Sequence, residues 1–238
     1  MCHLNPFILS SYARMKAPTK QSTIAGVLLD MDGVLCDSEP FILEAAQTMF
    51  LQRYGKEIPA EDFHPFVGAG EDRYIGGPAE KHGLQINLAM DKTFVYALYL
   101  DLIVGRLQPL PGVVAFVENC RQQGIKLAVA SSADRVKVDG NLQQIGLPPE
   151  DFDAIVCGSD VVRKKPDPMV FLEAANRIGV KPHKCLVIED APNGIRAGKA
   201  AGSRCLGITS TFSIEQLQHA GADYVASDLA HLPPGVMD

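Results

Sequence analysis

Two aspartates that stand one residue apart, Asp30 and Asp32, follow an apolar run and precede Gly33. Residues two apart on a strand point to the same face, and a glycine lets the chain turn so that the second carboxylate approaches the first. Close carboxylates repel, so one tends to keep its proton while the other stays ionised. Such a pair can supply a nucleophile and a general acid, or a metal ligand and an acid–base group. A strand that ends in two solvated acids is the alternative interpretation of this motif taken alone.

Polar side chains also follow two other apolar runs, residues 125–130 and 185–188, which are typical of buried strands. In an open parallel sheet, ligands bind beyond the carboxyl ends of the strands, where the strand order reverses. These polar side chains are therefore candidates for the same site as the aspartates, although each alone is also explained as the cap of a following helix. They are Ser131, Ser132, Glu189 and Asp190.

A lysine at position 165 stands directly before Pro166. Because a proline restricts the preceding residue to extended backbone, the Lys165 ammonium is presented from a stiff loop. Taken alone, Lys165 is also explained as an ordinary surface cation. The net charge of −6 means that a phosphorylated substrate would need such local positive charge.

Strands and helices alternate after residue 105, which predicts a parallel sheet covered by helices on both faces. Helical periodicity dominates between residues 41 and 104, where one helix ends at Gly55 and another begins at Asn87, with glycine-rich breaks at 68–70 and 76–78. We therefore expect an α/β fold, a doubly wound parallel sheet core with an inserted all-helical cap domain. The expected domains are a disordered leader over 1–23, a core over 24–38 and 105–238, and a cap over 39–104.

The composition of the 238 residues, 47% hydrophobic and 21% charged, is typical of a soluble globular protein. The acidic balance argues against a nucleic-acid partner, and no apolar run is long enough to span a membrane. Six scattered cysteines without a C-x-x-C pair favour reduced thiols and a cytoplasmic location. The leader contains basic residues and no acids. We expect a disordered tail or a true start at Met15, with an organellar targeting peptide as the alternative.

Four segments in this order resemble the signature motifs of the haloacid dehalogenase superfamily, in its aspartyl-phosphate branch. The helical region between the first and second motifs is similar to the small cap of the β-phosphoglucomutase-like and phosphoglycolate-phosphatase-like members. The four segments are residues 30–35, residues 127–131, Lys165-Pro166, and residues 187–190 followed by Gly194.

The resemblance implies a role for each of these residues. Asp30 is expected to attack phosphorus, and Asp32 to protonate the leaving oxygen and then accept a proton from water. The resemblance also implies Mg²⁺ as the cofactor, an ion that prefers about six oxygen ligands. The expected magnesium ligands are Asp30, the backbone carbonyl of Asp32, Asp190 and the nearby Glu189, and the expected phosphate-binding residues are Ser131, Ser132 and Lys165.

The expected activity is hydrolysis of a small phosphorylated metabolite, of the sugar phosphate or phosphoglycolate type. Asp32 argues against the dehalogenase and phosphonoacetaldehyde-cleaving branches, which lack this second acid. A β-phosphoglucomutase-like hexose-phosphate mutase is the alternative, but the hinge histidine and cap arginine of such enzymes correspond to Ile42 and Glu71. A catalytically silent binding domain is a third hypothesis.

The loop of the expected cap is the candidate specificity element, through Gly70, Glu71 and Arg73. An anion at Glu71 would repel the far phosphate of a bisphosphate, although Arg73 could replace the missing arginine from a shifted loop. A plain turn between helices is the alternative explanation of this loop. We expect a monomer or weak dimer.

Overall fold

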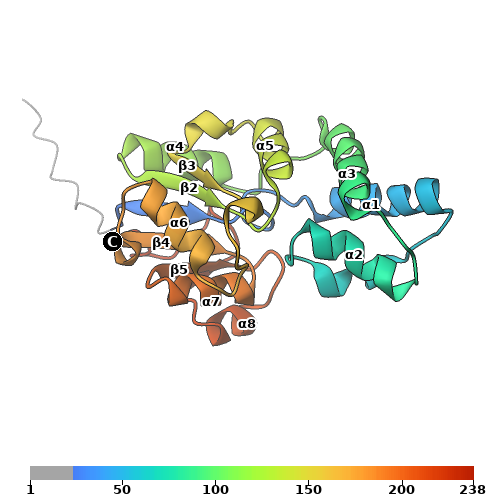
Figure 1. Ribbon diagram of the computed structural model, residues 1–238. Helices are drawn as coiled ribbons and strands as arrows, with labels where there is room; N and C mark the ends of the chain where they lie inside the picture. Colours follow the sequence, from blue (N-terminus) through green and yellow to red (C-terminus); the bar gives the residue numbers. More distant parts are fainter. Residues whose placement is uncertain (1–23) are drawn as a thin grey trace, which may run out of the picture.

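A parallel six-stranded sheet forms the centre of one lobe of the molecule (Figure 1). The structure, a computed structural model, describes residues 24–238, and the expectations for the leader lie outside this range. The strand order is β3-β2-β1-β4-β5-β6. The strands are β1 (Gly26–Leu29), β2 (Lys126–Ala130), β3 (Ala154–Val156), β4 (Cys185–Glu189), β5 (Arg204–Ile208) and β6 (Tyr224–Ala226).

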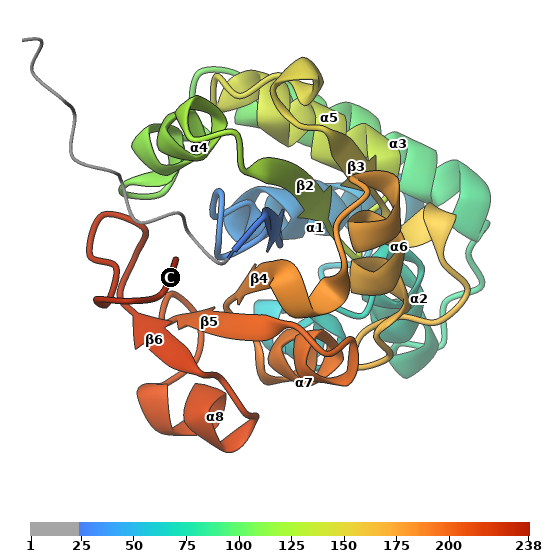
Figure 2. The same cartoon turned by 90° about the vertical axis from the view of Figure 1, so that its left-hand side faces the viewer.

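Helices cover both faces of this sheet, because strands buried on both faces carry apolar side chains at successive positions. In β1, Leu28 packs into the cluster formed with α6, α7 and α8, whereas Val27 and Leu29 point to the opposite side, into the cluster that contains α4 and α5. Figure 2 shows α4 and α6 on opposite sides of β2. These helices are α4 (Val113–Gln122), α5 (Arg135–Gln144), α6 (Met169–Arg177), α7 (Pro192–Ala200) and α8 (Ile214–His219).

Residues 39–104, here called the helical insert, form the second lobe and contain helices and turns without a strand. Its helices are α1 (Glu39–Tyr54), α2 (Glu71–Lys81) and α3 (Leu88–Ile103), with short 3₁₀ turns at Ala60–Asp62 and His64–Phe66. Gly55 ends α1 in the left-handed region, and the Asn87 side chain accepts a hydrogen bond from the Met90 amide, as the sequence predicts. The α/β fold with a helical insert is therefore confirmed.

Two connecting segments join the insert to the sheet lobe, and they lie side by side. Cys36 and Pro109 form an antiparallel bridge, and the Leu110 amide donates to the Leu35 carbonyl oxygen over 3.0 Å. Apolar side chains of α1 and α3 belong to the same buried cluster as Val27 and Leu29 of β1. The insert thus packs continuously onto the lobe that holds the sheet.

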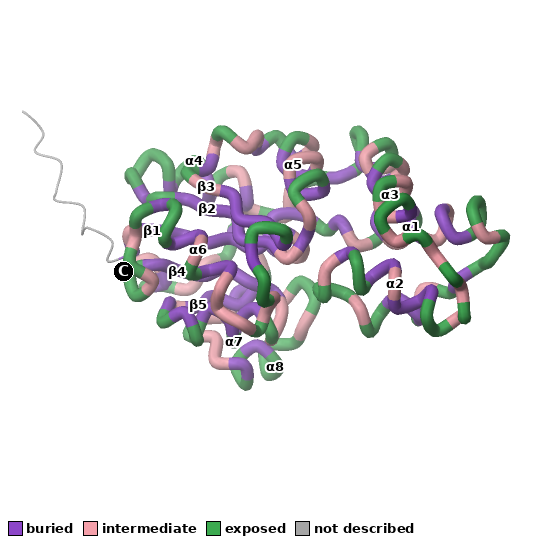
Figure 3. The backbone as a smooth tube through the Cα atoms, in the orientation of Figure 1, coloured by how far each residue is buried: buried purple, intermediate pink, exposed green. Residues whose placement is uncertain are grey.

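The expected break at residues 76–78 is wrong, because α2 runs through it. Proline lacks an amide hydrogen, so Pro78 removes one hydrogen bond from the helix. Burial of Tyr74, Ile75 and Ala79 in the core offsets this loss. Figure 3 shows that α2 contains buried as well as exposed stretches. Gly77 is required by packing, since a Cβ there would lie 2.2 Å from the Phe66 ring.

The described cysteines are unpaired and buried, consistent with the expected reduced thiols; they are Cys36, Cys120, Cys157, Cys185 and Cys205. Within residues 24–238, no helix is both long and apolar enough to cross a bilayer.

The neighbouring glycines of α2 provide a matched test of its packing. Gly76→Ala is expected to raise the free energy of unfolding by about 0.5–1 kcal/mol, because glycine is a poor helix former and nothing lies within 4 Å of the added Cβ. Gly77→Ala is expected to lose this gain, because the Phe66 ring must move. Thermal and urea unfolding of both variants measures the difference, and equal stabilisation would contradict the packing of α2 on Phe66.

Candidate active site

The strand order reverses between β1 and β4, the strands that carry the first and last candidate motifs. Leu29 of β1 pairs with Ile188 of β4, and the Asp30 amide donates to the Ile188 carbonyl oxygen over 3.0 Å. Asp30 and Glu189 therefore stand level with each other at the carboxyl edge of the sheet. This edge is where open parallel sheets bind their ligands.

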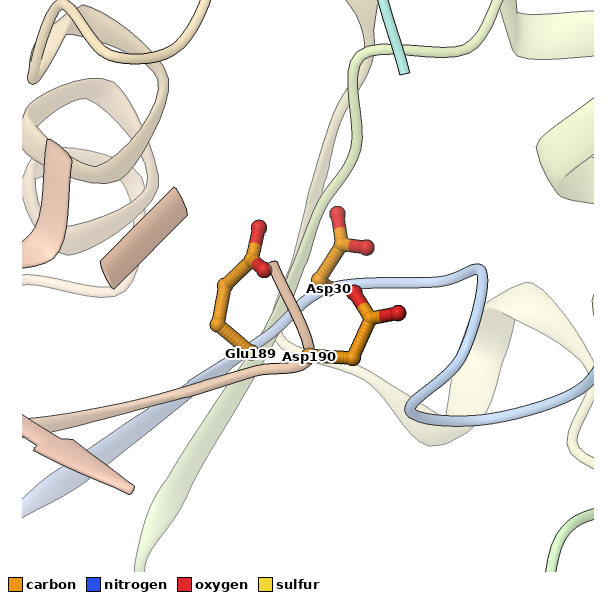
Figure 4. A group of neighbouring side chains, drawn as sticks. All are labelled: Asp30, Glu189 and Asp190. Atoms are coloured by element: carbon orange, nitrogen blue, oxygen red, sulfur yellow. The ribbon is translucent and has the colours of Figure 1, made fainter. Parts of the chain in front are cut away.

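Three buried carboxylates meet at this edge (Figure 4). Asp30, Glu189 and Asp190 each offer one oxygen, and these oxygens lie within 4.8 Å of one another. Asp30 comes from the end of β1, and the other two from the end of β4. The sequence prediction that these acids converge agrees with this geometry.

Two glycines make room for the carboxylates. Gly33 has a φ of +76°, and a Cβ on it would lie 2.1 Å from Oδ2 of Asp190. A Cβ on Gly194, in the first turn of α7, would lie 1.7 Å from Oε1 of Glu189. Glycine is therefore required at both of these motif positions for steric reasons, because any side chain would displace a carboxylate.

Lys165 bridges two of these carboxylates. Its ammonium donates to Oδ1 of Asp30, to Oε1 of Glu189 over 2.9 Å and to the Ala130 carbonyl oxygen over 3.1 Å. It also lies 5.0 Å from the centre of the Phe171 ring. The Lys165–Pro166 peptide bond is cis. Lys165 therefore links the ends of β1, β2 and β4 through one buried cation.

The negative charge of this cluster exceeds what Lys165 neutralises. Burial, with the charge of Glu189, raises the pKa of Asp30 to about 7, although Lys165 acts in the opposite sense. Burial, with the charges of Glu189 and Asp30, raises the pKa of Asp190 to about 8. Burial alone would lower the pKa of Lys165, but Asp30 and Glu189 raise it above its ordinary value. The site is therefore suited to a further cation.

A divalent magnesium ion fits this donor set, because it prefers oxygen ligands and interacts strongly with carboxylates. Both oxygens of Glu189 have partners, since Oε1 accepts from Lys165 and Oε2 accepts from the Ala191 amide over 2.8 Å. Asp30 and Asp190 are therefore the better candidates for direct ligands. Glu189 is better placed to orient Lys165 and ligand waters.

The Asp32 carboxylate lies outside this three-carboxylate cluster and has its own partners. Ser38 donates to its Oδ1, and the Lys137 ammonium lies 3.0 Å from its Oδ2. The Asp32 side chain is 34% exposed, in contrast to the buried Asp30. The two aspartates of the motif thus have different environments, one buried among carboxylates and the other partly exposed beside a cation.

The two serines after β2 lie at the adjacent strand end. Ser131 is buried, and its hydroxyl accepts a hydrogen bond from the Ala133 amide over 3.1 Å. Ser132 is half-buried, and its carbonyl oxygen would lie 3.7 Å from a Cβ on Gly70. The loop before α2 therefore approaches the loop after β2.

The candidate residues of the insert have different environments. Gly70 precedes α2, and Glu71, the first residue of α2, is buried with its Oε1 3.7 Å from the Lys137 ammonium. Arg73 is exposed, pairs with Glu80 at 3.3 Å and lies over the Phe66 ring. The geometry thus brings Glu71 towards Asp32, whereas Arg73 interacts within the insert.

Sequence reasoning missed the two partners of Asp32. Ser38 resembles an ordinary helix cap, since it directly precedes α1, but its side chain makes no cap hydrogen bond. Lys137 stands in the first turn of α5, where the helix dipole disfavours a cation. A lysine in the first turn of a predicted helix is therefore a sequence signal for a nearby anion that stabilises it.

A family model described as haloacid dehalogenase-like hydrolase matches residues 24–202. Protein SUPPRESSOR OF QUENCHING 1, chloroplastic, of Arabidopsis thaliana is 40% identical over 214 residues, which are 88% of this chain but 20% of that relative. The phosphorylated carbohydrates phosphatase of Thermotoga maritima is 33% identical over 207 residues, 82% of this chain and 91% of the relative. The crystal structure of CbbY from Rhodobacter sphaeroides in complex with phosphate superposes with a TM-score of 0.78 at 26% identity, over 90% of this chain and 99% of that one.

Magnesium binding is expected to raise the unfolding temperature, because a ligand that binds only the folded state stabilises it. Asp190→Asn should abolish most of this shift, whereas Asp101→Asn, which removes an exposed acid from α3, should retain it. Thermal unfolding with and without millimolar MgCl₂ measures both. An unchanged shift in Asp190→Asn would exclude Asp190 as a ligand.

The metal-free protein is expected to lose stability as the pH rises. A carboxyl with a pKa near 7 or 8 in the folded protein, against an ordinary value of 3.8, binds its proton more tightly when folded. The stability that the protonated carboxyl contributes is therefore fully present below the ordinary pKa, and it is lost as the pH rises through the pKa of the folded protein. Unfolding temperatures between about pH 5 and pH 9 should fall more steeply in the parent protein than in Asp190→Asn, and magnesium should flatten the curve, since it favours the ionised carboxylates.

Proposed function

Because this chain belongs to the haloacid dehalogenase-like hydrolases, we propose that it is a magnesium-dependent phosphatase of a small phosphorylated metabolite, acting through a phosphorylated Asp30. The observation that supports this most is the convergence of Asp30, Lys165 and Asp190 at one sheet edge, with Asp32 held separately beside them. The substrate class is that named for the Thermotoga relative, phosphorylated carbohydrates.

In the first step, the Asp30 carboxylate attacks phosphorus while the bond to the leaving oxygen breaks. Asp32 donates its proton to that oxygen, so the leaving group departs as a neutral alcohol. Lys165, with Ser131 and Ser132, holds the phosphoryl oxygens. Phosphoryl transfer depends mostly on this positioning and on neutralising charge.

In the second step, water attacks the phosphorylated Asp30. Asp32, now ionised, accepts a proton from this water as the acyl phosphate bond breaks. Inorganic phosphate leaves, and both aspartates return to their starting states. Asp30, Asp190 and the Asp32 carbonyl oxygen would hold magnesium, which would supply charge neutralisation at the phosphoryl oxygens.

The helical insert is proposed to act as a cap that excludes water during the first step. The approach of Gly70 to Ser132 and of Glu71 to Lys137 supports this role. A dry site strengthens every electrostatic interaction with the phosphoryl group. The proposed domains are the core over 24–38 and 105–238 and the cap over 39–104.

A mutase remains the alternative, but Glu71 favours hydrolysis. A mutase must hold a second phosphate at the cap, whereas the buried Glu71 offers a carboxylate whose Oε2 makes no hydrogen bond within the described residues. Burial raises the pKa of Glu71, and Lys137 acts in the opposite sense. An acceptor at this position suits substrate hydroxyls better than a second phosphate.

Phosphate release from a panel of sugar phosphates, phosphoglycolate and p-nitrophenyl phosphate is the direct test. Turnover should require Mg²⁺ and fall by at least about a thousandfold in Asp30→Asn, because no nucleophile remains. Mass spectrometry should detect phosphate on Asp30 in the parent protein. Absence of turnover across the panel would refute the proposal, and activity in Asp30→Asn would refute the nucleophile. A phosphorylated Asp30 would also eliminate a silent binding domain.

Glu71 is expected to set the preference for substrates with one phosphate. Glu71→Gln should increase kcat/KM for sugar bisphosphates relative to monophosphates by about tenfold, because it removes like-charge repulsion in a buried place. Glu80→Gln, which alters an exposed acid of the same helix, is the control. Isomerisation of β-glucose 1-phosphate, primed by a bisphosphate, would instead support the mutase.

A monomer or weak dimer in the cytoplasm, without nucleic-acid or membrane partners, completes the proposal. The name of the Arabidopsis relative contains the word chloroplastic, so location in an organelle is the competing expectation.

A further inference from the structure

Lys137 is a buried cation that neither the sequence motifs nor the proposed chemistry uses. Its side chain is 4% exposed, and its ammonium lies 3.0 Å from Oδ2 of Asp32 and 3.7 Å from Oε1 of Glu71. It also lies 5.9 Å from the centre of the Tyr99 ring. Lys137 therefore stands between the aspartate of the sheet lobe and two side chains of the helical insert.

The position of Lys137 is unfavourable unless its anionic partners compensate. Burying an ammonium removes its hydration, and the first turn of α5 places it near the positive end of the helix dipole. Burial alone would lower its pKa, but Asp32 and Glu71 raise it well above the ordinary value. The cation thus depends on these two carboxylates.

Asp32 is held from two sides. Ser38 binds Oδ1, and Lys137 binds Oδ2, so the carboxylate plane is fixed although the side chain is 34% exposed. Without Lys137, the Asp32 side chain could turn towards water. Proton transfer requires the donor oxygen within hydrogen-bond reach of the leaving oxygen, so this restraint bears on catalysis.

The insert determines where Lys137 can lie. Helix α5 packs against α3 so closely that a Cβ on Gly140 would lie 2.4 Å from the Leu100 side chain (Figure 1). Tyr99 of α3 lies beneath the ammonium and also donates to the Asn141 side chain of α5. Glu71 arrives from α2. The placement of Lys137 thus depends on docking of the insert.

We propose that Lys137 is a positioning residue that holds the Asp32 carboxylate for both proton transfers, with Glu71 fixing its other side when the insert is docked. This inference rests on the proposed phosphatase function. Lys137 exchanges no proton with the substrate. Asp32 gives its proton to the leaving oxygen in the first step and accepts one from water in the second.

A comparison of leaving groups separates this role from a merely structural one. p-Nitrophenolate leaves without protonation, whereas a sugar alkoxide requires the Asp32 proton. In Lys137→Met, kcat for a sugar phosphate should fall about 10–100-fold, part of the usual effect of general acid–base catalysis, with KM changed by less than about threefold. With p-nitrophenyl phosphate, the first step should stay within about threefold of the parent rate.

The second step should then be slow, because Asp32, the base in that step, is no longer held in position. Stopped-flow mixing of Lys137→Met with p-nitrophenyl phosphate should give a burst of about one p-nitrophenolate per enzyme, followed by slow turnover, because phosphorylated Asp30 accumulates. Lys137→Arg, which keeps the charge, should recover most of the activity. Arg135→Met, which removes an exposed cation from the same helix, should behave as the parent protein does.

A double-mutant cycle tests whether Lys137 acts through Asp32. In an Asp32→Asn background, Lys137→Met should change kcat by less than about twofold, because the group that it positions is already inactive. Additive losses in the cycle, or equal losses of the first-step rate for both leaving groups, would overturn the proposal and leave a structural role. If Lys137→Met does not fold, Lys137→Gln is measured in the same way. Failure of the parent protein to hydrolyse any monoester refutes the phosphatase itself, which is a separate outcome.

Discussion

The enforced proximity of like charges at the edge between β1 and β4 is the constraint on which the site depends. Carboxylate oxygens of Asp30, Glu189 and Asp190 approach within 4.8 Å of one another, although burial and the charge of Glu189 raise the pKa of both Asp30 and Asp190. Parallel pairing of two buried strands fixes the backbone, and the absence of side chains at Gly33 and Gly194 provides the space. The cluster therefore attracts cations, and Lys165 neutralises only part of its negative charge.

The strands were predictable because burial on both sides of a parallel sheet leaves continuous apolar runs. The apolar runs at residues 125–130 and 185–188 agree within one residue with β2 (Lys126–Ala130) and β4 (Cys185–Glu189). The continuation of α2 through residues 76–78 was not predictable in the same way. Glycine and proline ordinarily interrupt helices, and only the three-dimensional position of the Phe66 ring explains Gly77.

The residues of the candidate site also divide into those that local sequence predicts and those whose placement depends on tertiary packing. Asp30, Lys165, Glu189 and Asp190 were expected together because each follows a strand or a stiff loop, and the structure brings them together. Lys137 was not expected, because its burial arises from the contact of α5 with the insert, which local sequence does not encode. Glu71 and Arg73, two residues apart, have opposite exposures, and this follows from how α2 packs.

The paired segments at Cys36 and Pro109 join the two lobes through a narrow, hydrogen-bonded ribbon. They are the two places where the chain leaves and re-enters the sheet lobe, while the buried cluster that α1 and α3 share with β1 keeps the lobes packed together. Because the insert is confined between these two neighbouring segments, its sequence can change while the parallel sheet keeps its register. Such separation allows one scaffold to acquire new specificities over evolution without rebuilding its reactive centre.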